Sequence, residues 1–109
     1  MKEIKAYIRE TMADRVVDAV ERIPEAPGVT VLHVRGYGHA ADTGQTGQVR
    51  MVKLEIDVAD DLLRTVVDAI LQNARTGDGH PGDGKVFVSD IAEAYRIGDG
   101  ATGEEALHG

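Results

Sequence analysis

The chain has 109 residues, a length typical of one domain with its own core. It contains no cysteine, which excludes disulfides and thiolate chemistry and fits a reducing compartment such as the cytoplasm. Its net charge of -7 argues against nucleic acid as a partner, and no apolar run approaches the roughly 18 residues that a membrane-spanning helix needs, so we expect no membrane span.

The first half of the chain predicts a strand, a helix and a second strand. Residues 3–9 alternate between polar and apolar side chains, as a half-buried strand does. Apolar residues at helical spacing follow, and Pro24 and Pro27 end that helix. Residues 29–37 are rich in β-branched side chains and predict the second strand. The glycine-rich stretch 36–47 is longer than a tight hairpin needs, so we expect a functional loop there, with an exposed solvated loop as the alternative.

The second half predicts a strand, a helix, a further strand and a tail. Residues 49–58 alternate strictly, and one face of that strand carries Val52, Leu54, Ile56 and Val58. Asp60 is the predicted N-cap of a second amphipathic helix. Residues 86–89 predict the last strand. The small, polar and acidic residues 98–109 predict a mobile tail.

The resulting order, βαββαβ, is the ferredoxin-like arrangement of the α+β class. We expect an antiparallel sheet with two helices on one face, formed by residues 1–97, and a flexible acidic tail at 98–109. The other face of such a sheet stays open and is often buried by oligomerisation. Tyr7, Met51 and Phe87 are expected on that open face.

The most informative segment is residues 76–96, which begins with the glycine-rich run T-G-D-G-H-P-G-D-G-K and ends at Arg96. Its glycines allow a ligand to approach the backbone closely, and Lys85 and Arg96 are available to meet an anion. The segment formally contains the G-x-x-x-x-G-K pattern of a P-loop. A P-loop, however, follows a strand, opens a helix and needs Ser or Thr where this chain has Val86. We interpret the segment as a phosphate-holding loop of another kind. A helix C-cap glycine followed by an ordinary turn remains the alternative.

Metal and catalytic sites are not expected from the sequence. The scattered candidates for metal ligands are His33, His39, His80, Asp42, Asp78 and Asp83. No two of the histidines have the spacing of a known metal motif. No general base or nucleophile stands at a useful spacing, so we expect no catalytic residues and no enzyme.

Four segments match a known family. They are MKEIKAYI at the start, GVTVLHVRGYG at 28–38, VKLEIDVADDLLRTVVDAILQNARTG at 52–77, and GDGKVFVSDIAEAYRI at 82–97. On these segments the chain resembles the P-II signalling proteins and their shorter P-II-like relatives, from residue 1 to about residue 103.

The resemblance implies a regulatory homotrimer that binds adenine nucleotides in the clefts between subunits. No cofactor is implied, and whether Mg²⁺ accompanies the nucleotide is left open. In P-II proteins the base lies near the segment that corresponds to Val29 and Thr30. The phosphates meet two glycine segments, which correspond to residues 36–38 and 82–85, and a basic residue that corresponds to Arg96. The nucleotide-binding residues implied here are Val29, Thr30, Gly36, Tyr37, Gly38, His39, Gly82, Asp83, Gly84, Lys85 and Arg96.

The chain also departs from the P-II pattern. The family's effector loop is shortened, its uridylylated tyrosine has no counterpart between Ala40 and Gln48, and Ala40 replaces the glutamine that helps bind metal and 2-oxoglutarate. Sensing of 2-oxoglutarate in the P-II manner is therefore not expected. The second arginine of the family's R-x-R pair falls on Gly98. With one phosphate-binding cation missing, we predict that ADP or AMP binds at least as well as ATP.

The function expected from this resemblance is signalling to a protein partner through residues 36–47. The partner would be a transporter or a metabolic enzyme, in nitrogen or in carbon and bicarbonate metabolism. The alternative is a trimer that binds divalent cations, like the CutA proteins, which share the fold.

Overall fold

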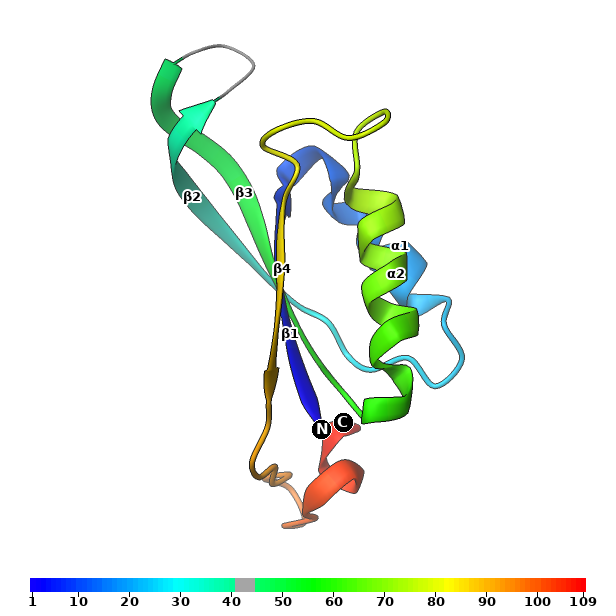
Figure 1. The fold of residues 1–109 in the computed structure, drawn as a ribbon. Helices are drawn as coiled ribbons and strands as arrows, with labels where there is room; N and C mark the ends of the chain where they lie inside the picture. Colours follow the sequence, from blue (N-terminus) through cyan, green and yellow to red (C-terminus); the bar gives the residue numbers. More distant parts are fainter. Residues whose placement is uncertain (41–44) are drawn as a thin grey trace.

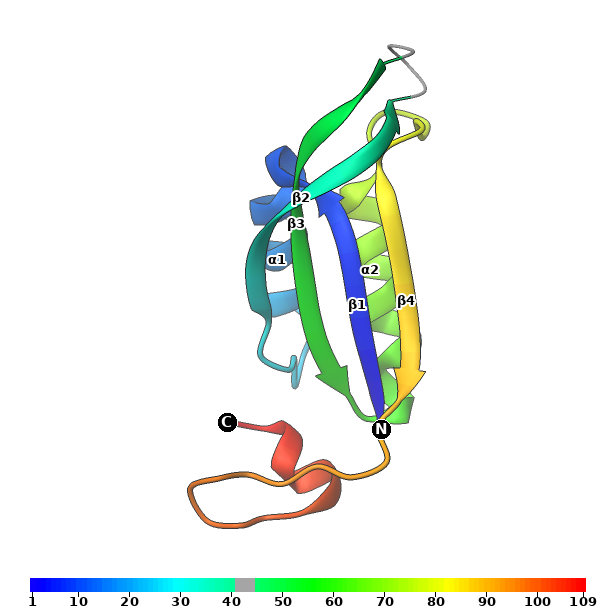
Figure 2. The same ribbon diagram turned by 90° about the vertical axis from the view of Figure 1, so that its left-hand side faces the viewer.

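Four antiparallel strands form one sheet with the order β2-β3-β1-β4 (Figure 2). Their bounds are Lys2–Arg9 for β1, Thr30–Ala40 for β2, Gln45–Val58 for β3 and Gly84–Asp90 for β4. The computed structural model describes residues 1–40 and 45–109, apart from the side chains of residues 38–40 and 45–48. The element order confirms the predicted ferredoxin-like fold.

Helices α1 (Ala13–Glu21) and α2 (Leu63–Ala74) both cover the same face of the sheet (Figure 1). A 3₁₀ turn leads into each helix, and neither helix has a side-chain cap. The prediction of Asp60 as an N-cap is therefore wrong. Its carboxylate instead accepts a hydrogen bond from the N-terminal amine of Met1 at 2.8 Å.

The core lies between the sheet and the two helices. The predicted core faces of the first and third strands are confirmed, because Ile4, Ala6, Ile8, Val52, Leu54, Ile56 and Val58 are all at most 1% exposed. The helices contribute Val16, Val20, Val66 and Ile70, which are fully buried. Each such aliphatic side chain contributes about 1.5–3 kcal/mol of transfer free energy. The other face of the sheet carries no helix and is open.

Strands β2 and β3 pair much further than the sequence predicted. Their register runs from Thr30 opposite Glu55 to Ala40 opposite Gln45. Most of the expected loop at 36–47 is therefore a two-stranded ribbon, which extends beyond the helices (Figure 1). Residues 41–44 of the expected loop lie outside the described residues.

The C-terminal residues, expected to be a mobile tail, make defined contacts beside the end of the sheet where the N-terminus lies (Figure 2). Gly103–Leu107 form a 3₁₀ helix, and Tyr95 makes an isolated bridge with Thr102. Among the described residues, no helix combines the length and the apolar character needed to cross a bilayer.

Candidate functional site

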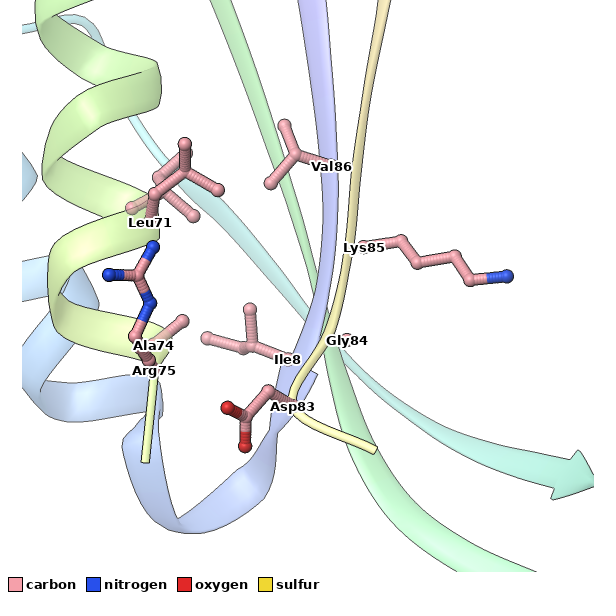
Figure 3. Close-up of a pocket in the computed structure, with 9 residues that line it drawn as sticks. Ile8, Leu71, Ala74, Arg75, Asp83, Gly84, Lys85 and Val86 are labelled. Atoms are coloured by element: carbon pink, nitrogen blue, oxygen red, sulfur yellow. The ribbon is translucent and has the colours of Figure 1, made fainter. Parts of the chain in front are cut away.

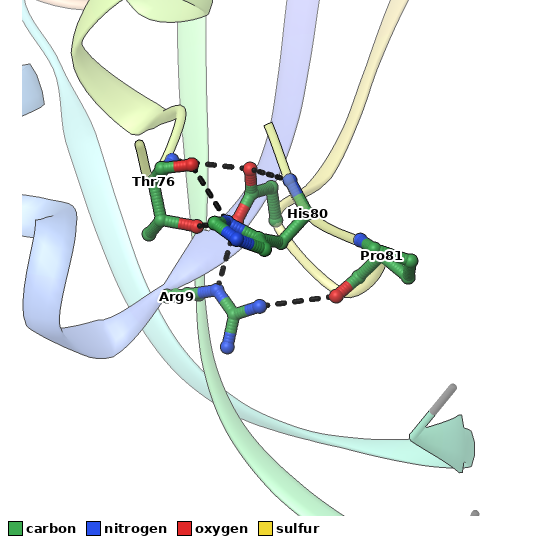
Figure 4. A network of polar contacts seen from close by, with 5 residues as sticks. Arg9, Thr76, His80 and Pro81 are labelled. Atoms are coloured by element: carbon green, nitrogen blue, oxygen red, sulfur yellow. Dashed lines mark hydrogen bonds and ion pairs between the residues drawn. The ribbon is translucent and has the colours of Figure 1, made fainter. Parts of the chain in front are cut away.

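The glycine-rich loop between α2 and β4 is folded around the Asp83 carboxylate, which Thr76, His80 and Arg9 surround with hydrogen-bond donors (these three are labelled in Figure 4). That carboxylate accepts hydrogen bonds from the Thr76 hydroxyl at 2.6 Å and from the backbone N–H groups of Thr76 and His80 at 3.1 and 2.9 Å. Arg9 of β1 donates its Nε–H to the same carboxylate at 3.0 Å and an Nη2–H to the Pro81 carbonyl at 3.1 Å. The loop is thus tied to β1 and to the end of α2.

These contacts keep Asp83 ionised. Burial by itself would raise the pKa of the Asp83 carboxyl. The hydrogen bonds from Thr76, His80 and Arg9 outweigh that effect and hold the pKa well below its ordinary range. Since its oxygens face Thr76, His80 and Arg9, the Asp83 carboxylate is placed to hold the loop in shape.

Arg9 was not singled out from the sequence, and topology explains why. Ile8 lies opposite Gly84 in the β1–β4 register, so the end of β1 meets the start of β4. Once the strand order is known, Arg9 is the first cation beside the loop. Without the strand order, nothing in the sequence places residue 9 near residue 83.

Gly84 is required by strand packing. A Cβ at this position would lie 1.7 Å from the Tyr7 carbonyl oxygen, and the backbone φ is +117°, which side-chain-bearing residues rarely adopt. The glycine lets β4 begin directly against β1. Strand packing therefore requires glycine at position 84, whether or not a ligand contacts this residue.

Lys85 points to the open face of the sheet. The residues on the other side of β4 line an apolar hollow of about 180 Å³ between β4 and α2, and Lys85 extends away from that hollow (Figure 3). On the open face, a hollow of about 380 Å³ brings together two predicted segments, Gly36–Tyr37 and Gly84–Lys85. In the described part of the chain no ion pair engages Lys85.

Aromatic and apolar side chains form the wall of this open-face hollow. They include Tyr7, Met51 and Phe87, which confirms their predicted place on the open face. The Tyr7 and Phe87 rings meet edge to face, with centroids 6.2 Å apart, and the Lys53 ammonium lies 5.9 Å from the Tyr7 centroid.

A second hollow, of about 360 Å³, surrounds the start of β2. Val29 and Thr30 line it together with the carboxylates of Glu3, Glu55 and Asp57. Burial, and then the charge and hydrogen bond of Glu3 directly opposite, raise the pKa of Asp57. One Asp57 oxygen, Oδ1, is buried and has no hydrogen-bond partner among the described residues.

Arg96 lies in neither hollow. It follows β4 at the far end from Lys85, and its guanidinium is held by the C-terminal segment through Asp99, Glu105 and His108. At roughly 3.3 Å per residue, the part of β4 from Lys85 to its last residue, Asp90, spans about 16 Å, and Arg96 follows beyond that end.

The predicted site residues thus fall into three groups within one chain. Gly36 and Tyr37 lie with Gly84 and Lys85, and the loop residues Gly82 and Asp83 directly precede them. Val29 and Thr30 lie at the start of the edge strand β2, and Arg96 lies beyond the end of β4. Gly38 and His39 belong to the ribbon through their backbone pairing.

No group of three metal-ligating side chains comes together among the described residues. Of the scattered histidines and acids, Asp42 and the side chain of His39 lie outside the described part.

Comparison with known proteins decides the family. A sequence profile described as "Nitrogen regulatory protein P-II" matches residues 1–101. The chain belongs to the P-II family. P-II proteins are regulatory signalling proteins and not enzymes, so the expected class of regulatory protein is confirmed. Of the two families considered from the sequence, P-II and CutA, the match is to P-II.

Individual P-II proteins match over nearly their whole length. The protein named "Nitrogen regulatory protein P-II" from Bradyrhizobium diazoefficiens is 36% identical, covering 98% of this chain and 100% of the relative. "Nitrogen regulatory protein P-II 1" from Escherichia coli K12 is 39% identical, covering 96% of each. The solved structure of Arabidopsis thaliana PII bound to citrate superposes with a TM-score of 0.81 at 34% identity, covering 98% of this chain and 89% of that one.

Proposed function

We propose that this P-II protein binds adenine nucleotides between neighbouring copies of the chain and signals their presence to a protein partner. The observation that carries the proposal is the open-face hollow, where the glycine segment at Gly36 meets the start of β4. Lys85 projects on this side of the sheet, and the preceding loop is held in shape by Asp83. Glycine backbone beside an ammonium group that makes no ion pair within the described residues suits a phosphate chain.

The site would need more than one copy of the chain. Val29 and Thr30 lie on one edge strand, Lys85 lies on the other, and Arg96 lies beyond the opposite end of β4. If all of them act on one nucleotide, the base and one cation must come from a neighbouring copy. A closed homotrimer, as the family resemblance implies, provides three equivalent clefts of this kind.

The number of cations favours the less charged nucleotides. Gly98 stands where P-II proteins have a second arginine, so Arg96 and Lys85 are the two cations nominated for the phosphates. Losing a charge-assisted contact costs about 1.5–3 kcal/mol. We therefore expect ADP or AMP to bind at least as well as ATP.

The signal would pass through the β2–β3 ribbon. Gly36 belongs both to the hollow and to the ribbon, so a ligand in the hollow touches the root of an element that projects from the body (Figure 1). A ligand shifts such an element only through its differential affinity for two ribbon states. The partner would be a transporter or an enzyme of nitrogen or of carbon and bicarbonate metabolism, in the cytoplasm.

Calorimetric titration with AMP, ADP and ATP, each with and without Mg²⁺ and bicarbonate, tests the proposal. We expect saturable binding that Lys85→Ala weakens at least tenfold, since it removes a charge-assisted contact. The matched control is Arg64→Ala, which removes one positive charge from an exposed position of α2. Absence of binding by the wild-type protein, or equal weakening by the two variants, would overturn it.

A further inference from the structure

The Arg96 guanidinium is already occupied by an anion of its own chain. Its Nε–H and Nη2–H groups donate to the two oxygens of Asp99 at 3.0 and 2.6 Å. Its Nη1 donates to the carbonyl oxygens of Glu105 and His108 at 2.9 and 3.0 Å. The C-terminal segment therefore uses every nitrogen of this side chain.

A carboxylate held in this way imitates a phosphate. The two parallel N–H···O bonds between a guanidinium and a carboxylate have the same geometry as the bidentate contact that arginine makes with a phosphate group. Asp99 and a ligand phosphate cannot both use the Nε–Nη2 edge of Arg96. One must leave when the other binds.

Local backbone structure holds Asp99 in place. The N–H of Gly100 donates to the Arg96 carbonyl, and the N–H of Arg96 donates to the Ala101 carbonyl, both at 2.8 Å, which closes a tight turn. The Ala101 N–H donates to Asp99 Oδ1 at 3.0 Å. Gly100 supplies the positive φ of +74° that this turn uses. Arg96 first, and then the Ala101 N–H, lower the pKa of Asp99, so the carboxylate stays charged.

We propose that Asp99 is a built-in counter-anion that a ligand phosphate must displace from Arg96, and that it thereby sets both the affinity of the site and its preference among phosphate chain lengths. This inference rests on the proposed function, because it takes Arg96 to be a phosphate ligand. The P-II resemblance puts Gly98 in place of a second arginine, and the residue after it contributes a competing negative charge.

Displacement has a direct consequence for selectivity. Once freed from Arg96, the Asp99 carboxylate remains close by on the same turn and repels the incoming phosphate. The repulsion grows with the charge of the ligand. Asp99 therefore weakens ATP binding more than AMP binding, and neutralising it should tighten ATP binding most.

The test is a calorimetric titration of the full chain with ATP, ADP and AMP at one ionic strength. Asp99→Asn keeps the shape of the side chain and removes its charge, and we expect ATP affinity to rise about fivefold, the range of an exposed ion pair. Asp99→Glu keeps the counter-anion and should stay within about twofold of the wild type. Glu104→Gln removes one negative charge from the same segment without touching the contacts to Arg96, and it too should stay within about twofold.

A second measurement reads the ion pair directly. In the ¹⁵N spectrum, the Arg96 Nε–H signal should move when ATP is added to the wild-type protein, and it should move without ligand in Asp99→Asn. Circular dichroism checks that each variant is folded.

The outcomes separate this inference from the proposed function. ATP binding that is tighter in Asp99→Asn than in the wild type, and unchanged in Asp99→Glu and Glu104→Gln, supports the inference. Binding that Lys85→Ala weakens, with Asp99→Asn equal to the wild type, overturns the inference and leaves the proposed function standing. No binding by the wild type or by Asp99→Asn overturns both.

Discussion

At position 84 a single missing side chain lets β4 pair with β1. Because a Cβ there would lie 1.7 Å from the Tyr7 carbonyl oxygen at a φ of +117°, Gly84→Ala must shift one strand away from the other. We expect the free energy of unfolding to fall by about 3 kcal/mol or more, through combined collision and backbone strain. Urea unfolding followed by circular dichroism measures the change.

Gly100→Ala is the matched control for that substitution. Gly100 also has a positive φ, +74°, but no atom lies within 4 Å of its added Cβ. Its cost should be the backbone strain alone, about 1–2 kcal/mol. Equal losses in the two variants would show that the approach of β4 to Tyr7 is not the constraint we infer.

The same glycine shows a limit of sequence interpretation at the level of single residues. Close approach to a ligand and close approach to another strand both require glycine, and the sequence does not distinguish them. For Gly84 the structure supplies the second cause. This end of β4 is a candidate site because Lys85 points toward the open face. That direction follows from the alternation of side chains along a strand, and the number of glycines nearby does not determine it.

At the scale of elements, the loop before β4 depends on one carboxylate. Asp83→Asn loses the charge that the Thr76, His80 and Arg9 donors share, and should lower the free energy of unfolding by about 1–3 kcal/mol at pH 7. Since the folded state lowers the pKa of Asp83, its contribution is complete above the unfolded value of about 3.9 and is lost as the pH falls further. Chemical unfolding of both proteins at pH 7, 5 and about 3 measures this difference.

Asp78→Asn serves as the control in the same loop. Asp78 is exposed, so its substitution should change stability by less than about 0.5 kcal/mol. Two results would contradict the role of the ionised carboxylate. One is a difference in free energy of unfolding between Asp83→Asn and the wild type that stays constant from pH 7 down to pH 3. The other is a difference no larger than that caused by Asp78→Asn.

Elements with one buried face were predictable from the sequence. The strict alternation that puts Val52, Leu54 and Ile56 on one side exists because helices cover only that side, so strand identity and core residues follow from one pattern. The starts of the helices were not predictable, because a 3₁₀ turn precedes each one and the acid expected to cap the second binds the N-terminal amine instead.

Elements without a buried face were missed. The sequence of the ribbon formed by β2 and β3 beyond Gly36 is mostly polar residues and glycines, so no apolar alternation marks it as strand. The contacts of Arg9 with Asp83 and of Arg96 with the C-terminal segment are likewise invisible in the sequence. The first depends on strand order, and the second depends on a turn that has no apolar pattern.

At the scale of the whole molecule, the open face of the sheet carries exposed apolar side chains among its charged ones. Phe87 is 54% exposed and Leu32 is 38% exposed, and both lie on the side that faces away from the helices, near Tyr7 and Met51. Large apolar side chains that gather in one exposed place are typical of interfaces in soluble proteins. Together with a nucleotide site divided between the two edges of one chain, it favours assembly through this face.

Phe87→Glu tests that assembly. A carboxylate buried in an apolar interface costs about 2 kcal/mol or more, and symmetry repeats the cost in every copy. We expect the wild-type protein to have the mass of three chains and the variant to shift toward one chain, measured by light scattering after gel filtration. Leu71→Glu is the control, because Leu71 is similarly exposed, at 44%, but lies on α2 on the other side of the sheet.

The same variant links assembly to ligand binding. Lys85 and Arg96 of one chain lie at opposite ends of β4, so a dissociated chain retains at most part of the proposed site. Phe87→Glu should therefore lose nucleotide affinity as it dissociates, and because Phe87 also lines the open-face hollow, its new carboxylate adds repulsion of the phosphates to that loss. A monomeric variant that binds ADP as tightly as the wild type would mean that one chain holds the complete site, and the division of the site between copies would then be wrong.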